Sequence, residues 1–243
     1  MISISTNYGS MFASKAAGAA QKNMNSAMEK LSSGMRINNA KDDAAGQGIA
    51  TRLTAEITSL NMASRNASDA QAMIDTAEAA HQEVHAILLR MREIAVQASN
   101  GTLSASDRTA LNAEVSALEI EITSIADNTA FAGINLGTGV SVAFQIGTAN
   151  GNVLNHKFVD FDVSSIGGNI AVNSVSTATA ALATVDAAIS TVSANRGTLG
   201  ALSNRLSSTI TNLDNVSVNL SSARGRIQDT DFAEETSNLA KSQ

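Results

Sequence analysis

The chain has 243 residues, of which 44% are hydrophobic and only 3% aromatic, so alanine and aliphatic residues must supply most of any core. It contains no cysteine, which excludes disulfides and thiol chemistry, and no proline, which leaves long helices uninterrupted. The net charge is −6 and no basic stripe is present, so no nucleic-acid partner is predicted. No signal peptide and no run of about 18 apolar residues is visible, so no membrane insertion is predicted.

The first predicted helix is weakly amphipathic. Its apolar positions recur at helical spacing and are mostly alanine: Ala17, Ala20, Met24, Ala27 and Leu31. Gly34 and the pair Asn38-Asn39 interrupt this pattern. Asp42-Asp43 then place negative charge where free backbone N–H groups of the next helix favour it, so a short joint separates two helices.

A long second helix is predicted over about residues 44–99. Apolar residues follow one another at spacings of three and four, as in a coiled coil, at Leu60, Ala63, Ala67, Ala70, Ile74, Ala77, His81, Val84, Leu88, Met91, Ala95 and Ala98. No glycine lies between Gly48 and Gly101, which allows a helix of roughly 80 Å. Asn100-Gly101-Thr102 ends it.

A third helix, over about residues 104–128, should fold back antiparallel on the second. Ser104 with Asp107 three positions later is a variant of the capping box. The apolar positions are Leu111, Val115, Leu118, Ile122 and Ile125.

Residues 130–170 have a different composition and predict a small β-hairpin region. Residues 140–146 alternate with period two, residues 153–163 do so less well, and residues 148–152 between them are turn material. We expect the hairpin to pack on the helices through its phenylalanine and valine side chains.

The last long helix, over about residues 177–230, has a strict seven-residue repeat of branched aliphatic side chains. This heptad row consists of Val185, Val192, Leu199, Leu206, Leu213, Leu220 and Ile227. Such a repeat predicts left-handed supercoiling, here with the second helix as partner. The sequence therefore predicts a mainly α fold, an elongated antiparallel helical bundle or coiled coil of long helices with a small β-hairpin region.

One motif offers an alternative as a metal site. His81 and His85 lie one helical turn apart with Glu78 nearby, a spacing that can bind zinc. Glu83 is not adjacent to His81 as in the protease motif, and His81 lies on the apolar stripe, so we favour structural histidines, one packed and one at the surface. No catalytic residue, cofactor or metal is expected.

Six separated stretches resemble the bacterial flagellin family. They are residues 4–7, 31–46, 63–69, 90–100, 208–213 and 221–235. Their order and spacing cover nearly all of both ends of the chain. The resemblance implies a non-enzymatic structural subunit of the flagellar filament, extracellular, used for swimming motility and exported through the flagellar type III apparatus without a cleaved signal peptide.

The resemblance also implies domains and partners. Residues 1–41 would be the N-terminal part of an inner coiled-coil domain, residues 42–231 a rod domain, and residues 232–243 the start of a C-terminal inner-domain helix. Because the family usually carries outer domains where this chain has only residues 164–176, and a longer last helix, we expect a short form that is incomplete at its C-terminus. The implied partners are further copies of the chain, an export chaperone, and cap and junction proteins.

Toll-like receptor 5 is a further implied partner, because it grips a similar stretch in flagellins that alert animal cells. The corresponding receptor or intersubunit surface here would comprise Arg90, Arg92, Glu93, Ile94, Gln97 and Glu114. On a helix Arg90, Ile94 and Gln97 lie on one stripe. Two alternatives stay open: a merely solvated charged face, and a hook-filament junction protein or minor flagellin, which shares the terminal repeats more than residues 90–100.

Overall fold

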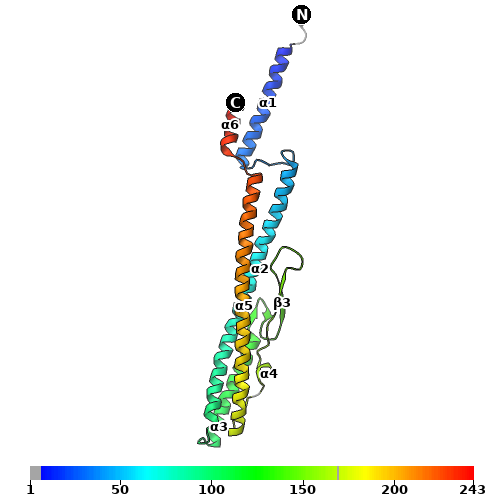
Figure 1. Cartoon of the computed structure of the whole chain (residues 1–243). Helices are drawn as coiled ribbons and strands as arrows, with labels where there is room; N and C mark the ends of the chain where they lie inside the picture. Colours follow the sequence, from blue (N-terminus) through cyan, green and yellow to red (C-terminus); the bar gives the residue numbers. More distant parts are fainter. Residues whose placement is uncertain (1–6, 169) are drawn as a thin grey trace. The chain divides into compact units, whose positions relative to one another are not determined.

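The computed structural model describes residues 7–168 and 170–243, and it confirms a mainly α fold of long helices with small antiparallel strand pairs (Figure 1). In chain order the elements are α1 (Tyr8–Ser33), α2 (Ala44–Ala98), α3 (Ala105–Asn128), β1 (Ala130–Phe131), β2 (Ile134–Asn135), β3 (Ser141–Gln145), β4 (Val153–Lys157), α4 (Val163–Ile166), α5 (Val175–Gln228) and α6 (Phe232–Ser242). Residues 4–6 of the predicted signature lie outside the described residues.

The described residues form two compact units. One unit is Met62–Leu213, and the other combines the residues up to Asn61 with Asp214–Gln243. The division falls within α2 and α5.

The helix ends follow the predicted local chemistry. Asp43 Oδ1 accepts hydrogen bonds from the backbone N–H groups of Ala45 and Gly46 at 3.0 and 2.9 Å, which caps the start of α2. Ser104 and Asp107 form a complete capping box at the start of α3, with each side chain bonded to the other's backbone N–H. These caps explain why the observed bounds of α2 and α3 lie within a residue of the predicted ones.

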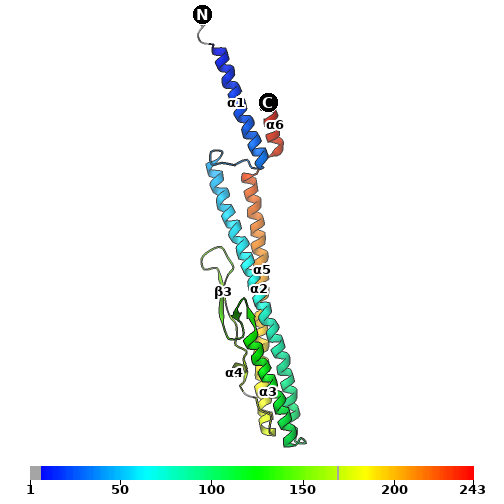
Figure 2. The same cartoon turned by 180° about the vertical axis from the view of Figure 1, so that it is seen from behind.

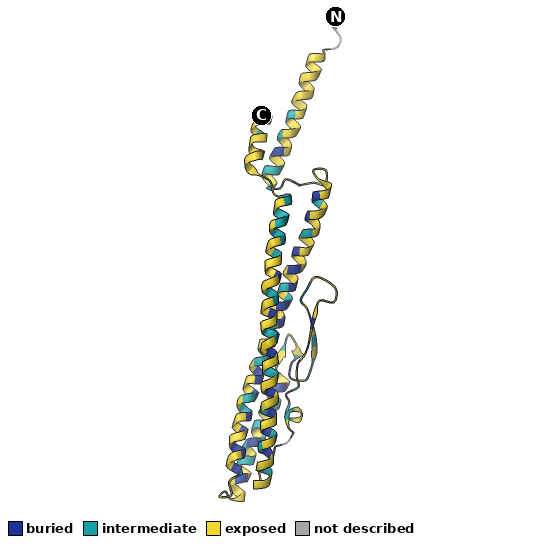
Figure 3. Ribbon diagram, viewed as in Figure 1, coloured by how far each residue is buried: buried dark blue, intermediate teal, exposed yellow. Residues whose placement is uncertain are grey.

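In the unit Met62–Leu213, α2 lies beside both α3 and α5, and both of these helices run antiparallel to it (Figure 2). Buried residues recur along these helices at intervals of three and four positions, with exposed residues between them (Figure 3). The resulting core is a row of small and aliphatic side chains. Its members form two clusters along α2.

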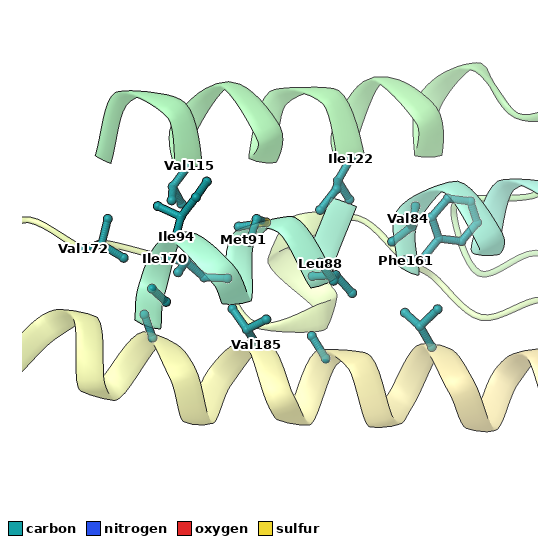
Figure 4. Close-up of a cluster of buried hydrophobic side chains, with 14 of the residues drawn as sticks. Val84, Leu88, Met91, Ile94, Val115, Ile122, Phe161, Ile170, Val172 and Val185 are labelled. Atoms are coloured by element: carbon teal, nitrogen blue, oxygen red, sulfur yellow. The ribbon is translucent and has the colours of Figure 1, made fainter. Parts of the chain in front are cut away.

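The first cluster joins α2, α3 and α5 near the α2–α3 connection. Figure 4 shows Leu88 and Met91 of α2 between α3 and α5, with Val115 and Ile122 contributed by α3. Phe161, Ile170 and Val172 of the connection to α5 complete it. Three helices and one extended segment therefore share a single core.

Two polar side chains of α3 hold this extended segment by its backbone. The Ile170 N–H donates to Glu119 Oε1, and the Val172 N–H donates to Asn112 Oδ1 at 2.8 Å. Glu119 is buried, and burial raises the pKa of its carboxyl group, although the bond from Ile170 acts in the opposite direction. These bonds satisfy backbone donors that would otherwise be buried without partners.

The second cluster packs the hairpin on α2 and α5. Leu154 and Phe158 of the hairpin are buried together with Ile74 of α2 and Leu206 of α5. Val142 and Phe144 of β3 pack against this cluster, whereas the intervening residues of that strand are exposed. The predicted attachment by one apolar face is confirmed.

The β region is more divided than the sequence predicted. β3 pairs antiparallel with β4, but β4 ends at Lys157 because Phe158 and Phe161 turn into the core. A second, two-residue hairpin joins β1 and β2, and a short helix, α4, follows Asp162. Neither element was predicted, since two-residue strands and a four-residue helix are too short to show a period.

In the other unit, α6 packs on α1, and the joint after α1 pairs with the end of α5. Gly34 adopts a left-handed conformation, φ 72°, and ends α1 with a hydrogen bond from its N–H to the Lys30 carbonyl. The Arg36 N–H donates to Gln228 O at 2.7 Å, and the Thr230 N–H donates to Gly34 O at 3.0 Å. These bonds hold the joint after α1 beside the segment between α5 and α6.

Candidate functional site

The predicted surface on α2 contains an exposed ion-pair network with α3. Arg90 donates from Nε and Nη2 to Glu114 Oε1 at 3.0 and 2.7 Å, and from Nη1 to Glu93 Oε2 at 3.1 Å. The bonds to Glu114 and then to Glu93 raise the pKa of the Arg90 guanidinium. All three side chains keep substantial exposure, so the charges lie at the surface.

Arg92 belongs to a different part of this surface. Its Nε donates to Asp186 Oδ1 on α5 at 2.6 Å, and this bond raises the pKa of Arg92. The structure therefore pairs Arg92 with α5 and Arg90 with α3, because residues two positions apart on a helix point in divergent directions. Asp186 was not predicted, since it lies 94 positions away along the chain.

Ile94 does not belong to the exposed surface, which corrects the predicted stripe. It is only 1% exposed and packs in the cluster that includes Val115 of α3 (Figure 4). The reason is that α3 covers the edge of α2 on which Ile94 lies. Gln97 is exposed, so the predicted positions that remain at the surface are Arg90, Arg92, Glu93, Gln97 and Glu114.

Two apolar residues that the sequence analysis did not single out take the place of Ile94. Leu89 and Val96 of α2 are 45% and 49% exposed. They are seven positions apart and off the apolar spacing of the helix, which is the signal that identifies them as surface residues. They add exposed apolar area to the same helix as Arg90 and Arg92.

The histidine pair is divided between core and surface. His81 is 1% exposed, and its ring lies 4.6 Å from that of Phe161. Burial lowers the pKa of His81 to about 4, so the imidazole is neutral at pH 7. His85 is half-buried, and Glu78 Oε1 accepts from Arg196 Nη2 of α5 at 2.8 Å, whereas Glu78 Oε2 is buried without a hydrogen-bond partner. Among the described residues no group of three or more metal-ligating side chains gathers.

The heptad row of α5 is buried along most of its length. Val185, Val192, Leu199, Leu206 and Leu213 are buried, and Leu220 and Ile227 are half-buried. By length and composition alone α5 could cross a membrane, with a mean hydropathy of 1.3 over its most apolar 18-residue window. Only 28% of that window is buried, and its buried residues pack in the core clusters with α2.

Paired long helices, with the joint after α1 hydrogen-bonded to the residues at the end of α5, define a helical structural protein. Residues 4–141 match the model of the bacterial flagellin N-terminal helical region, and residues 182–243 match that of the C-terminal helical region. The chain belongs to the bacterial flagellin family. Since members of this family are structural proteins, it is not an enzyme.

Similar proteins agree with this assignment. Flagellin A of Vibrio cholerae is 46% identical over 155 residues, which are 63% of this chain and 41% of that protein. The crystal structure of Bacillus cereus flagellin superposes with a TM-score of 0.57 at 31% identity, covering 61% of this chain and 88% of the other. The match thus spans about two fifths of the Vibrio protein.

A structure described as a putative flagellar hook-associated protein from Vibrio parahaemolyticus has the same fold. Its TM-score is 0.68 at 16% identity, with 77% of this chain and 100% of the other covered. At this identity the likeness concerns the fold alone.

Proposed function

We propose that the chain is a structural subunit of the bacterial flagellar filament that assembles with further copies of itself. The observation that carries this proposal is that the chain matches both helical regions of flagellin, with the joint after α1 hydrogen-bonded to the end of α5 through Arg36 and Thr230. It accounts for the exposed apolar side chains of α1, since Tyr8, Met11 and Phe12 are 74%, 63% and 76% exposed. Such a face is stable in water mainly when a partner covers it.

The proposal includes an extracellular location in the flagellum and export in the unfolded state. Helices packed through small and aliphatic side chains, without disulfides, suit a chain that must unfold for export and refold outside the cell. Its partners would then be an export chaperone, the cap under which subunits assemble, and the junction proteins.

Immunogold electron microscopy with antibodies against this chain tests the proposal on flagella sheared from the source bacterium. Labelling along the whole filament is expected. Labelling confined to the hook end would overturn the proposal in favour of a junction protein, and labelling of scattered short segments would favour a minor flagellin. Unlabelled flagella would exclude all three.

We further propose that the surface of Arg90, Glu93, Gln97 and Glu114 binds toll-like receptor 5. Exposed ion pairs contribute little to stability. The ion pair between Arg90 and Glu114 can therefore break, and each residue can bind a receptor group instead, with little loss of free energy. Arg90 is exposed, and arginine, with its planar guanidinium, is enriched at interface hot spots. In a filament the same surface would face a neighbouring subunit, so monomers signal and filaments do not.

A receptor-reporter assay tests this second proposal. Arg90→Ala and Glu114→Ala should weaken signalling, whereas Arg65→Ala, which removes another exposed arginine of α2, should leave it unchanged. Equal signalling by the parent and the first two variants, or no signalling by the parent, contradicts receptor binding at this surface.

A further inference from the structure

The chain contains two Asn-Gly pairs, which are the chemically least stable asparagine sequences in proteins. The backbone nitrogen of the glycine can reach the side-chain amide carbon of the asparagine, because glycine has no Cβ to hinder the approach. Asn100-Gly101 lies between α2 and α3, and Asn150-Gly151 lies at the tip of the β3–β4 hairpin. We propose that Asn150-Gly151 deamidates spontaneously in the folded chain and that the fold protects Asn100-Gly101.

The hairpin tip leaves the reacting groups of Asn150 and Gly151 unrestrained. Both residues are exposed. The Asn152 N–H donates to Ala149 O at 3.2 Å, and Gly151 has φ 94°, so the pair occupies the centre of a type II turn. Within residues 7–168 and 170–243, neither the Asn150 side chain nor the Gly151 N–H makes a hydrogen bond.

Asn100 is held by hydrogen bonds at its side chain and at its backbone. Its Oδ1 accepts a bond from the Thr102 N–H at 3.2 Å, and its own N–H donates to Gln97 O at 3.2 Å. Its carbonyl accepts a bond from Arg108 Nη2 at 2.8 Å, and Arg108 is buried and also donates from Nε to Ala98 O at 3.0 Å. Rotating the Asn100 side chain and backbone into the reactive geometry would break several of these bonds.

The chemistry requires only the chain and water. The Gly151 nitrogen attacks Cγ of Asn150, a C–N bond forms, and the bond from Cγ to the side-chain nitrogen breaks. Ammonia leaves with the proton from the Gly151 N–H, and a five-membered succinimide remains. Water then opens the ring at either carbonyl, which yields aspartate or isoaspartate at position 150.

Both products change the hairpin tip. Each adds one negative charge to a chain of net charge −6. Isoaspartate also adds one carbon to the backbone within the turn that the Asn152 N–H closes on Ala149, so this bond should be lost. The five paired positions of β3 and β4, with Phe144 packed against the core, lie outside the altered turn and should persist.

Mass spectrometry of peptides from the full folded chain, aged at mildly alkaline pH in ¹⁸O-labelled water, tests the proposal. Conversion at each site raises the peptide mass by about 1 Da in ordinary water and by about 3 Da in the labelled water, which marks hydrolysis during ageing. Asn150 should convert at least about tenfold faster than Asn100, a difference of about 1.4 kcal/mol in activation free energy. Asn150→Gln should remove the modification from the tip peptide.

The same chain in concentrated urea is the matched control. There both sites have the same dipeptide and no fold, so their rates should become similar, with Asn100 accelerated. Equal rates in the folded chain, or an Asn150 that stays intact while the chain in urea converts, would overturn the proposal. An equal preference for Asn150 in urea would also overturn it, since local sequence and not the fold would then decide.

Discussion

Removal of the Leu206 side chain should test the packing of α5 on α2 most directly. Leu206 is fully buried in the cluster that contains Ile74 of α2. Leu206→Ala deletes three carbon groups at about 0.8 kcal/mol each, or about 2.4 kcal/mol. The alanines of α2 around the site are too small to fill the space, so a cavity term should raise the loss of unfolding free energy to about 3 kcal/mol.

The same substitution at Leu220 provides a matched control on the same helix. Because Leu220 is half-buried, Leu220→Ala should cost about 1 kcal/mol. In thermal unfolding followed by circular dichroism, these losses correspond to decreases in Tm of about 6–12 °C for Leu206→Ala and about 2–4 °C for Leu220→Ala. Equal decreases for the two variants, or a change below about 2 °C at Leu206, would refute the packing argument.

Three further predictions concern acid stability, a close backbone approach and a helix cap. His81 is protonated near pH 6.5 in the unfolded chain but only near pH 4 in the folded chain. Its contribution to the free energy of unfolding is therefore complete above pH 6.5, and it falls by about 3 kcal/mol as the pH is lowered to 4. In denaturant titrations between pH 6.5 and 4, His81→Gln should lose less unfolding free energy than the parent chain, whereas His85→Gln should lose as much as the parent. Equal losses in all three chains would contradict the assignment of the pH dependence to His81. Gly137→Ala would force a methyl group into the carbonyl of Ala126, and we expect a loss of about 1–3 kcal/mol in denaturant unfolding; an unchanged midpoint would show that this connection moves freely. Ser104→Ala should cost about 1 kcal/mol and speed amide hydrogen exchange in the first turn of α3, whereas unchanged exchange would contradict the role of the cap.

The sequence by itself determined the long helices. The chain has no proline and no glycine between Gly48 and Gly101, which favours a continuous α2, and the Ser104 capping box marks the start of α3. The period of seven along α5 likewise predicted the burial of Val185, Val192, Leu199, Leu206 and Leu213. These features depend on local chemistry and on spacing along one helix, which a sequence contains in full.

Only the tertiary structure decided what lies between the helices. Ile94 has the spacing of a surface stripe, yet α3 covers it, and no pattern in α2 records where α3 will lie. Glu119 and Arg108 are charged residues of a helix, and such residues usually lie at the surface. They are buried here because Glu119 accepts from the Ile170 N–H and Arg108 donates to the Ala98 carbonyl, and these backbone groups come near them only in the folded chain. The physical reason is that the burial of a side chain depends on which helices and strands pack together. Such contacts join residues far apart in the sequence, for example Arg92 and Asp186, which are 94 positions apart.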